Sequence, residues 1–427
     1  MLIKDEISDI NACIRRYHKH YTLLTTASML GQIDCVKALL EYGANEDILC
    51  EIFFEVFFAS VSAIYLASFK GHIEIVKVLL EHGTSLNSPT CSPLCGACLA
   101  GDLELAKFLV DLGADVNHSS VLNPSLSLST NPLAAAARNG SIELIEYLIS
   151  KGADIHCDGD NQNALIEACF FDRYQVMEAL LRYGASINVC TEDPFKSSCM
   201  HVAGFDDNME MFKFLLARGA DVNACNVRAT PLEIAFDRGN DELMALLLDH
   251  GADPDMVRYE SPLTLLMSAA ANNSISTMKL LLKYGADINS TVQVRTRGLN
   301  WYIKVSTPLL VACKHGCVSA LRFLLEHGAD VNQIFNQYEQ NDTSLICIFR
   351  TRSWSKGQHQ RLTVDVNGDI IDLWPDQLAC LKLLLEHGAD VTVLNSEGKT
   401  VFDYVKDRPG VIRLLNEASM DTKPILK

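Results

Sequence analysis

Cysteines are the first residues whose type and spacing could support chemistry. Cys91, Cys95 and Cys98 lie close together, yet no CxxC or HxxxH partner follows at the spacing that zinc needs. Cys313 and Cys317 also lack a partner pair. The sequence contains neither a glycine-rich phosphate loop nor a Gly-x-Ser-x-Gly elbow, and its carboxylates are scattered. We therefore predict no catalytic residue, no metal site, no cofactor and no enzyme activity.

All three tryptophans lie toward the C-terminus, in locally basic segments. These segments hold Arg295, Arg297, Trp301 and Lys304, and then Arg350, Arg352, Trp354, Lys356, Arg361 and Trp374. Tryptophan and arginine are enriched at binding hot spots, and arginine can hold a carboxylate or phosphate through two hydrogen bonds. One interpretation is a recognition patch for an acidic or phosphorylated segment of a partner. The other is that Trp301 and Trp374 only anchor these segments while the arginines are solvated.

Composition narrows the class of protein. The 427-residue chain is 48% hydrophobic and has a net charge of -17, which disfavours nucleic acid and anionic membranes as partners. The apolar run at 52–67 is interrupted by Glu55 and is shorter than the about 20 residues of a bilayer span. The first 20 residues have no apolar signal-peptide region. The 15 scattered cysteines suit reduced thiols, so we expect an intracellular protein, cytoplasmic or nuclear.

The elements that organise these residues are clearest in the unit Ser306–Asn332. Thr307 can cap a helix, and Pro308 suits its first turn. Gly316 can take the left-handed conformation that ends this first helix. Leucines at helical spacing then form a second helix, which Gly328 ends in the same way. The unit is therefore predicted to be two antiparallel helices followed by a turn.

This unit resembles the ankyrin repeat, which has a turn, two helices, a Thr-Pro-Leu-His-x-Ala start and a period of about 33 residues. The matching residues run from Thr307 to Ala312, with Leu310 in place of the usual His; His201 keeps that His in another copy. The resemblance implies an all-α solenoid of about ten to eleven helix-turn-helix units with short β-hairpin turns. The expected units are Thr22–Gly43, Ser62–Gly83, Ser92–Gly113, Asn131–Gly152, Asn163–Gly184, Ser198–Gly219, Thr230–Gly251, Thr264–Gly285, Ser306–Asn332, a unit from Thr343 whose second helix comes at Gln377–Glu386, and a short last one.

Several segments depart from the regular unit. Residues 1–20 carry Ile7, Ile10 and Ile14 at helical spacing and are predicted to be a capping helix before the array at 21–416. Enlarged turns are expected at 44–61, 118–130 and 290–305, a C-terminal cap at 398–416 and a loose tail at 417–427. An insertion at 351–374 has alternating runs on either side of Asn367-Gly368, which predicts a β-hairpin.

Three first helices lack the terminal glycine. Asp172, Asp207 and Asn273 take its place. Asp and Asn tolerate the left-handed conformation better than other residues with a side chain, so we expect them to end their helices in the same way.

The resemblance also implies a binding surface. In ankyrin arrays the two residues before the first-helix glycine usually point into a concave groove. The candidate binding residues at these positions are Phe69, Leu99, Arg138, Phe170, Phe171, Phe205, Arg238, Lys314 and His315. Exposed aromatic residues there would form a partner site. The alternative is that the enlarged turns, above all the Phe-rich turn at 44–61, cover the phenylalanines.

These observations favour a non-enzymatic adaptor that binds a partner protein in the groove and is monomeric by itself. A substrate-receptor subunit of a ubiquitin ligase is the alternative, although 417–427 is too short for a C-terminal recruiting box of the kind such ankyrin proteins usually add. A host-directed microbial effector of the same architecture is also open.

Overall fold

The structure is a computed structural model. It describes residues 9–16, 19–54, 57–88, 90, 92–123, 128–156, 163–191, 197–205, 207–226, 229–257, 263–295, 303–333, 343–350, 363–364, 370–371, 373–395 and 397–421. The chain divides into two units, Met1–Val227 and Arg228–Lys427, and each is described by itself.

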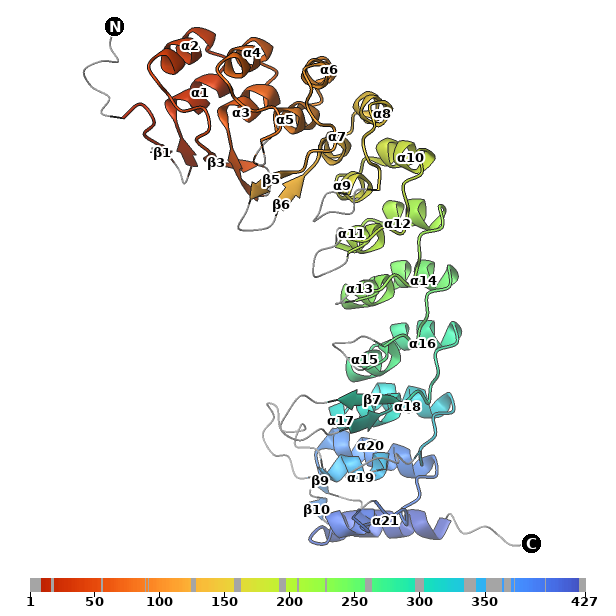
Figure 1. The fold of residues 1–427 in the computed structure, drawn as a ribbon. Helices are drawn as coiled ribbons and strands as arrows, with labels where there is room; N and C mark the ends of the chain where they lie inside the picture. The colour runs from red at the N-terminus through yellow and green to blue at the C-terminus, as the bar shows by residue number, and fades with distance from the viewer. Residues whose placement is uncertain are drawn as a thin grey trace. The chain divides into compact units, whose positions relative to one another are not determined.

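In its described residues, unit 1 contains six helix pairs. They are α1 (Leu23–Met29) and α2 (Ile33–Glu41), α3 (Ala63–Phe69) and α4 (Ile73–Glu81), α5 (Pro93–Ala100) and α6 (Leu103–Asp111), α7 (Pro132–Asn139) and α8 (Ile142–Ser150), α9 (Ala164–Phe170) and α10 (Tyr174–Arg182), and α11 (Cys199–Phe205) and α12 (Met209–Leu216). Each first helix packs on the first helix of the next pair, so the first helices form one row (Figure 1).

Unit 2 continues the pattern. Its helices are α13 (Pro231–Asp237) and α14 (Asp241–Asp249), α15 (Leu265–Ala271) and α16 (Ile275–Lys283), α17 (Pro308–His315) and α18 (Val318–Glu326), and α19 (Ser344–Arg350) and α20 (Pro375–Glu386), followed by the 3-10 helix η3 (Val401–Tyr404) and α21 (Pro409–Asp421). The described residues of the two units thus contain ten helix pairs, followed by η3 and α21. The predicted all-α solenoid is confirmed.

The local signals act as expected in the unit Ser306–Asn332. The Thr307 side chain accepts a hydrogen bond from the Leu310 N–H at 3.1 Å, and Pro308 occupies the first helical position. Gly316 ends α17 with a φ of 69°, and Gly328 follows α18 with a φ of 90°. Both values lie in the left-handed region that glycine adopts without steric cost.

The prediction that three other residues replace the helix-ending glycine is also confirmed. Asp172, Asp207 and Asn273 have φ values of 55°, 53° and 56°, and they are the non-glycine residues with positive φ in the described part of the chain. Each therefore ends a first helix in the left-handed conformation.

Small residues on the first helices let neighbouring repeats approach closely. Ala134–Ala137 on α7 are all buried. Gly96 on α5 lies so close to α3 that a Cβ there would be 2.9 Å from the Tyr65 carbonyl oxygen and 3.3 Å from the Phe69 nitrogen. Leucines such as Leu144 and Leu148 on the second helices complete the core.

A recurring hydrogen bond joins the turn tips of successive repeats. A side-chain oxygen in one tip accepts from a backbone N–H in the next, over 2.7–2.9 Å. The pairs are Asn11 to Asn45, Asn87 to Asp115, Asn117 to Asp154, Asn188 to Asp221, Asp255 to Asp287, Asn289 to Asp330 and Asn332 to Asp390. These bonds tie units together without side-chain burial.

The predicted capping helix at 1–20 is wrong over its described part. Ile14–Arg16 (β1) and Lys19–Tyr21 (β2) instead pair as an antiparallel hairpin. Before them, Asp9 accepts from the Asn11 N–H at 2.9 Å, the same turn that closes other tips. The helical spacing of Ile10 and Ile14 was misleading because local side-chain bonds favour a repeat tip here. Residues 1–8 lie outside the described residues.

The enlarged turns contain hairpins. Cys50–Phe54 (β3) pairs with Phe57–Val61 (β4), Ser120–Asn123 (β5) with Leu128–Thr130 (β6), and Val292–Arg295 (β7) with Ile303–Ser306 (β8). In unit 1, β2 lies beside β3 and β4 beside β5. The hairpins brace the starts of first helices, since the Ser92 N–H donates to Ser120 Oγ at 2.9 Å.

The predicted hairpin near the C-terminus is also present. Thr363–Val364 (β9) pairs with Ile370–Ile371 (β10), so the two strands face each other across Asn367-Gly368 as expected. Of the rest of the insertion, Leu373 and Trp374 are the described residues.

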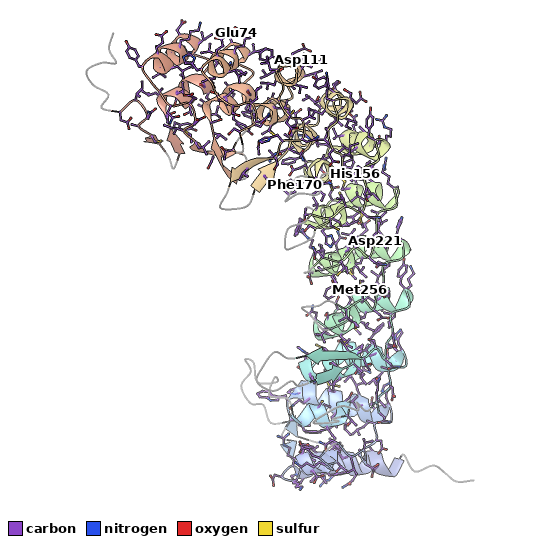
Figure 2. All side chains as sticks on the ribbon, viewed as in Figure 1. Glu74, Asp111, His156, Phe170, Asp221 and Met256 are labelled. Carbon is purple, nitrogen blue, oxygen red and sulfur yellow. The ribbon has the colours of Figure 1, made fainter. Side chains whose placement is uncertain are left out.

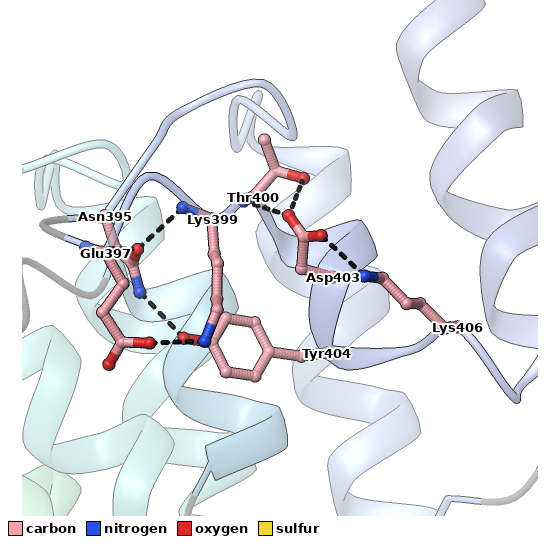
Figure 3. Close-up of polar contacts among 7 residues, drawn as sticks. All are labelled: Asn395, Glu397, Lys399, Thr400, Asp403, Tyr404 and Lys406. Atoms are coloured by element: carbon pink, nitrogen blue, oxygen red, sulfur yellow. Dashed lines mark hydrogen bonds and ion pairs between the residues drawn. The ribbon is translucent and has the colours of Figure 1, made fainter.

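The C-terminal cap is held by a polar network (Figure 3). Asn395 Oδ1 accepts from the N–H groups of Glu397 and Lys399, both at 3.0 Å, and its Nδ2 donates to the Tyr404 hydroxyl at 2.8 Å. Thr400 N–H donates to Asp403 Oδ2 at 2.9 Å and so caps η3.

The predicted loose tail at 417–427 begins too early, because α21 runs on to Asp421. The sequence contains neither Gly nor Pro between Val411 and Lys423, so nothing in the side chains ends the helix at Asn416.

Candidate partner-binding face

The predicted groove positions occupy the C-terminal ends of the first helices. Phe170 and Phe205 are 48% and 53% exposed, and Arg238 and His315 are also exposed. Phe69, Leu99, Arg138, Phe171 and Lys314 are half-buried. Phe170, labelled in Figure 2, lies at the end of α9, whereas the labelled Glu74 and Asp111 lie on second helices. Leu30, which occupies the same groove position in the first pair, is 60% exposed.

The hairpins cover this face at the N-terminal end of unit 1. Phe69 packs with Tyr21 of the first hairpin against a buried cluster that includes Val61 of the second. Tyr65 and Cys95 belong to the same cluster. For Phe69, the sequence interpretation in which the chain covers its own aromatic residue therefore holds.

Farther along unit 1 the aromatic residues reach solvent. Phe170 and Phe171 meet edge to face, with ring centroids 5.1 Å apart and planes at 67°. The guanidinium carbon of Arg138, on the neighbouring helix α7, lies 4.4 Å from the Phe171 ring centroid. Phe205 occupies the equivalent position on α11, which packs against α9. We call Arg138, Phe170, Phe171 and Phe205 the Phe170 patch.

Backbone contacts hold the ends of these helices in place. Arg173 Nε donates to the Arg138 carbonyl at 3.1 Å, and Asn139 Nδ2 donates to the Leu99 carbonyl at 3.0 Å. Each bond links a side chain to an orphan carbonyl of the preceding first helix. These hydrogen bonds therefore fix the backbone that carries the Phe170 patch.

A carboxyl group lies beneath this surface. Glu167 on α9 is half-buried, and loss of water around its carboxyl raises its pKa to about 7. The positive charge of Arg138 acts in the opposite direction and lowers that pKa. Sequence reasoning did not single out Glu167. Its position on the first helix was the available signal, because the neighbouring first helices carry the apolar residues Ala135 and Val202 there.

The second predicted patch is largely outside the described residues. Arg297, Trp301, Trp354 and Arg361 lie there, and of Arg295 only the backbone, in β7, is described. Trp374 is half-buried, and its backbone N–H donates to Gln377 Oε1 at 3.1 Å at the start of α20. Whether these residues share a surface stays a prediction.

His201 has the backbone contact expected of its place in the repeat. Its Nδ1 accepts from the Ser198 N–H at 3.2 Å and lies 2.8 Å from the Ser198 hydroxyl. It therefore steadies the start of α11.

Cysteine chemistry has little support in the described residues. Cys95 and Cys98 are buried, and burial raises the pKa of Cys95 to about 12. Such a thiol is a poor nucleophile at neutral pH. Among the described residues, no group of three His, Cys, Asp or Glu could hold a metal ion. Nor does any helix within the described ranges have the length and apolar character needed to cross a membrane.

Paired helices, left-handed helix ends and linked turn tips define a class, the repeat solenoids. The family model for ankyrin repeats (3 copies) matches residues 24–120, 94–191, 188–258 and 257–334. The chain therefore belongs to the ankyrin repeat family. Ankyrin repeats are typically protein-interaction modules.

Individual relatives match only in part. An ankyrin repeat and KH domain-containing protein of Caenorhabditis elegans, mask-1, is 32% identical over 123 residues, 28% of this chain and 4% of its own length. Human ankyrin repeat and SOCS box protein 6 is 30% identical over 141 residues, 31% of this chain and 33% of its own length. The chain thus matches a third or less of these relatives.

A solved structure is also similar. The human ASB11 ankyrin repeat domain has a TM-score of 0.41 and 24% sequence identity, and the match covers 55% of this chain and all of that domain.

Proposed function

We propose that this protein is a non-enzymatic adaptor that binds a partner protein on the first-helix face of unit 1, centred on the Phe170 patch. The observation that supports it is the exposure of Phe170 and Phe205 on adjacent first helices, whereas Phe69 on α3 packs against a buried cluster of the chain itself. Large aromatic side chains on an exposed surface are typical anchors of protein interfaces.

The mechanism is preorganisation. Arg138 stacks on Phe171, and its carbonyl is held by Arg173, so the partner meets side chains that are already ordered. Binding then costs little conformational entropy in the scaffold. The Arg138 guanidinium adds a charge that can pair with a carboxylate at the rim of the interface.

Replacing the exposed anchors should abolish binding without unfolding the array. In Phe170→Ser with Phe205→Ser, we expect capture of the cellular partner, found by cross-linking and mass spectrometry, to fall at least about tenfold. Thermal unfolding should stay near wild type because both rings are about half exposed. Leu112→Ser is the matched control, since Leu112 is 50% exposed at the end of a second helix. Equal loss in the control, or retained capture in the double variant, would contradict the proposal.

We also propose a second recognition surface at 290–305 and 351–374 for an acidic or phosphorylated segment. The basic residues Arg295, Arg297 and Arg361, with Trp301 and Trp354, support it by type. Replacing 351–374 by a short turn should leave α19 and α20 paired and remove binding of one partner. Unchanged binding to every captured partner would exclude this surface.

A substrate-receptor subunit of a ubiquitin ligase is the second candidate function. The similarity to a human protein named for ankyrin repeats and a SOCS box favours it. Affinity capture that returned cullin-type scaffold proteins would support this role. If another partner is strongly enriched and no cullin-type protein is captured, the result would favour the adaptor without a ligase role. We place either role inside the cell and expect a monomer, to be checked by microscopy of tagged protein and by light scattering.

A further inference from the structure

A pocket separate from the Phe170 patch opens between the starts of the second helices α10 and α12. It has a volume of about 760 Å³ and is lined by Asp172, Tyr174, Asn208, Glu210, Lys213 and Phe214. These residues all belong to unit 1. The pocket therefore combines two aromatic rings, two carboxylates, an amide and one ammonium group.

Tyr174 is unusual among the equivalent positions of the repeats. The residue ten places before the second-helix glycine is aliphatic, methionine or aspartate in the other pairs, namely Ile33, Ile73, Leu103, Ile142, Met209, Asp241, Ile275, Val318 and Leu378. The fold therefore does not require an aromatic ring at this position. The Tyr174 ring is half-buried and meets Phe214 edge to face, with centroids 5.2 Å apart and planes at 74°.

A cation of the chain itself already lies over one ring of this aromatic pair. The guanidinium carbon of Arg218 lies 3.5 Å from the Phe214 ring centroid, and Arg218 also pairs with Glu178. Since Arg218 and Glu178 neutralise each other, the charge of the pocket comes from its own lining. The negative face of an aromatic ring attracts a positive charge placed over it.

The lining has a net negative charge. Lys213 Nζ lies 2.7 Å from Glu210, but both side chains are exposed, at 53% and 75% of their area. Such a pair is weak and easily exchanged. Asn208 Nδ2 donates to Asp172 Oδ1 at 2.7 Å and holds the second carboxylate at the pocket. Two carboxylates against one ammonium group leave room for one further positive charge.

The starts of two helices also lie here, and their positive ends oppose a cation. In α12, however, the Asn208 side chain already accepts from the Met211 N–H at 3.0 Å, and Glu210 stands in the first turn. At the start of α12 these groups therefore offset the partial positive charge of the helix end.

We propose that this pocket binds a cationic side chain, lysine or arginine, presented by a basic segment of a partner protein. The aliphatic part would lie along Tyr174 while the charged head displaces Lys213 at Glu210. The net charge of -17 on the whole chain favours the approach of such a segment. The proposal does not depend on the Phe170 patch, because the two sites share no residue.

The test uses small probes on the full-length protein. N-acetyl-lysine methylamide and N-acetyl-arginine methylamide are titrated while the ring resonances of labelled tyrosines are followed, with Tyr174→Ile identifying the Tyr174 signal. N-acetyl-norleucine methylamide, which lacks the charge, is the matched control. We expect saturable millimolar binding of the cations and at least about threefold weaker binding of norleucine.

Four substitutions test the lining of the pocket. Glu210→Gln and Tyr174→Ile should each weaken lysine binding about threefold to tenfold, and Lys213→Met should strengthen it about twofold. Asp172→Asn removes the second charge but tolerates the left-handed backbone, so it should weaken binding without unfolding. Equal affinity for norleucine, no saturation, or unchanged binding in Glu210→Gln and Asp172→Asn would overturn the proposal.

Discussion

At the scale of single residues, Arg138 connects the exposed surface to the charge beneath it. Its guanidinium stacks on Phe171, and its positive charge lowers the pKa of Glu167, which burial raises to about 7. A carboxyl whose pKa is higher in the folded than in the unfolded protein keeps its proton longer when folded. The folded state therefore loses stability as the pH rises from about 4.5 to about 7.

Glu167→Gln should remove this pH dependence. Between pH 5 and pH 8 we expect the free energy of unfolding of wild type to fall relative to the variant by about 1 to 2 kcal/mol, allowing for water that still reaches this half-buried residue. Urea unfolding at several pH values measures the difference. Arg138→Met should steepen the fall, because the opposing charge is gone. Parallel curves for wild type and Glu167→Gln would show that this carboxyl does not titrate in the range.

At the scale of elements, close backbone approach between first helices matters more than helix propensity. Gly96 is the clearest case, because α3 leaves no room for a Cβ above it. The turn tips add a second link, in which a side-chain oxygen of one tip accepts from a backbone N–H of the next tip at several junctions. Both features act between neighbours only, as a solenoid requires.

Gly96→Ala tests which effect is larger. Alanine is favoured over glycine in a helix by about 1 kcal/mol, whereas overpacking costs about 1 to 3 kcal/mol. Since the contacts that a Cβ would make at Tyr65 and Phe69 are to backbone atoms, which cannot rotate away, we expect a net loss. A lower midpoint in urea unfolding would agree with this. A higher midpoint would mean that α3 and α5 can separate at little cost.

At the scale of the whole molecule, the chain is a series of similar repeats, and the proposed recognition residues stand where individual repeats depart from the pattern. Phe170 and Phe205 are exposed where regular packing needs no aromatic residue, and Tyr174 is aromatic where other pairs are not. The excess of acidic residues favours basic segments as partners over nucleic acid. Function in this protein is thus expected to reside in departures from the repeat rather than in the repeat itself.

The sequence by itself determined the ankyrin class, the helix pairs and their left-handed ends, because capping residues, Gly, Asp172, Asp207 and Asn273 act through local backbone chemistry. Local signals failed at 9–21, where hydrogen bonds between neighbouring tips favour a turn and a hairpin. Which groove aromatic residues are covered was also decided only by the tertiary structure. Burial of Phe69 and exposure of Phe170 depend on hairpins that pack from other repeats. The environment of the Glu167 carboxyl and the Tyr174 pocket likewise arise between neighbouring repeats. Residue spacing within one repeat does not predict contacts of this kind.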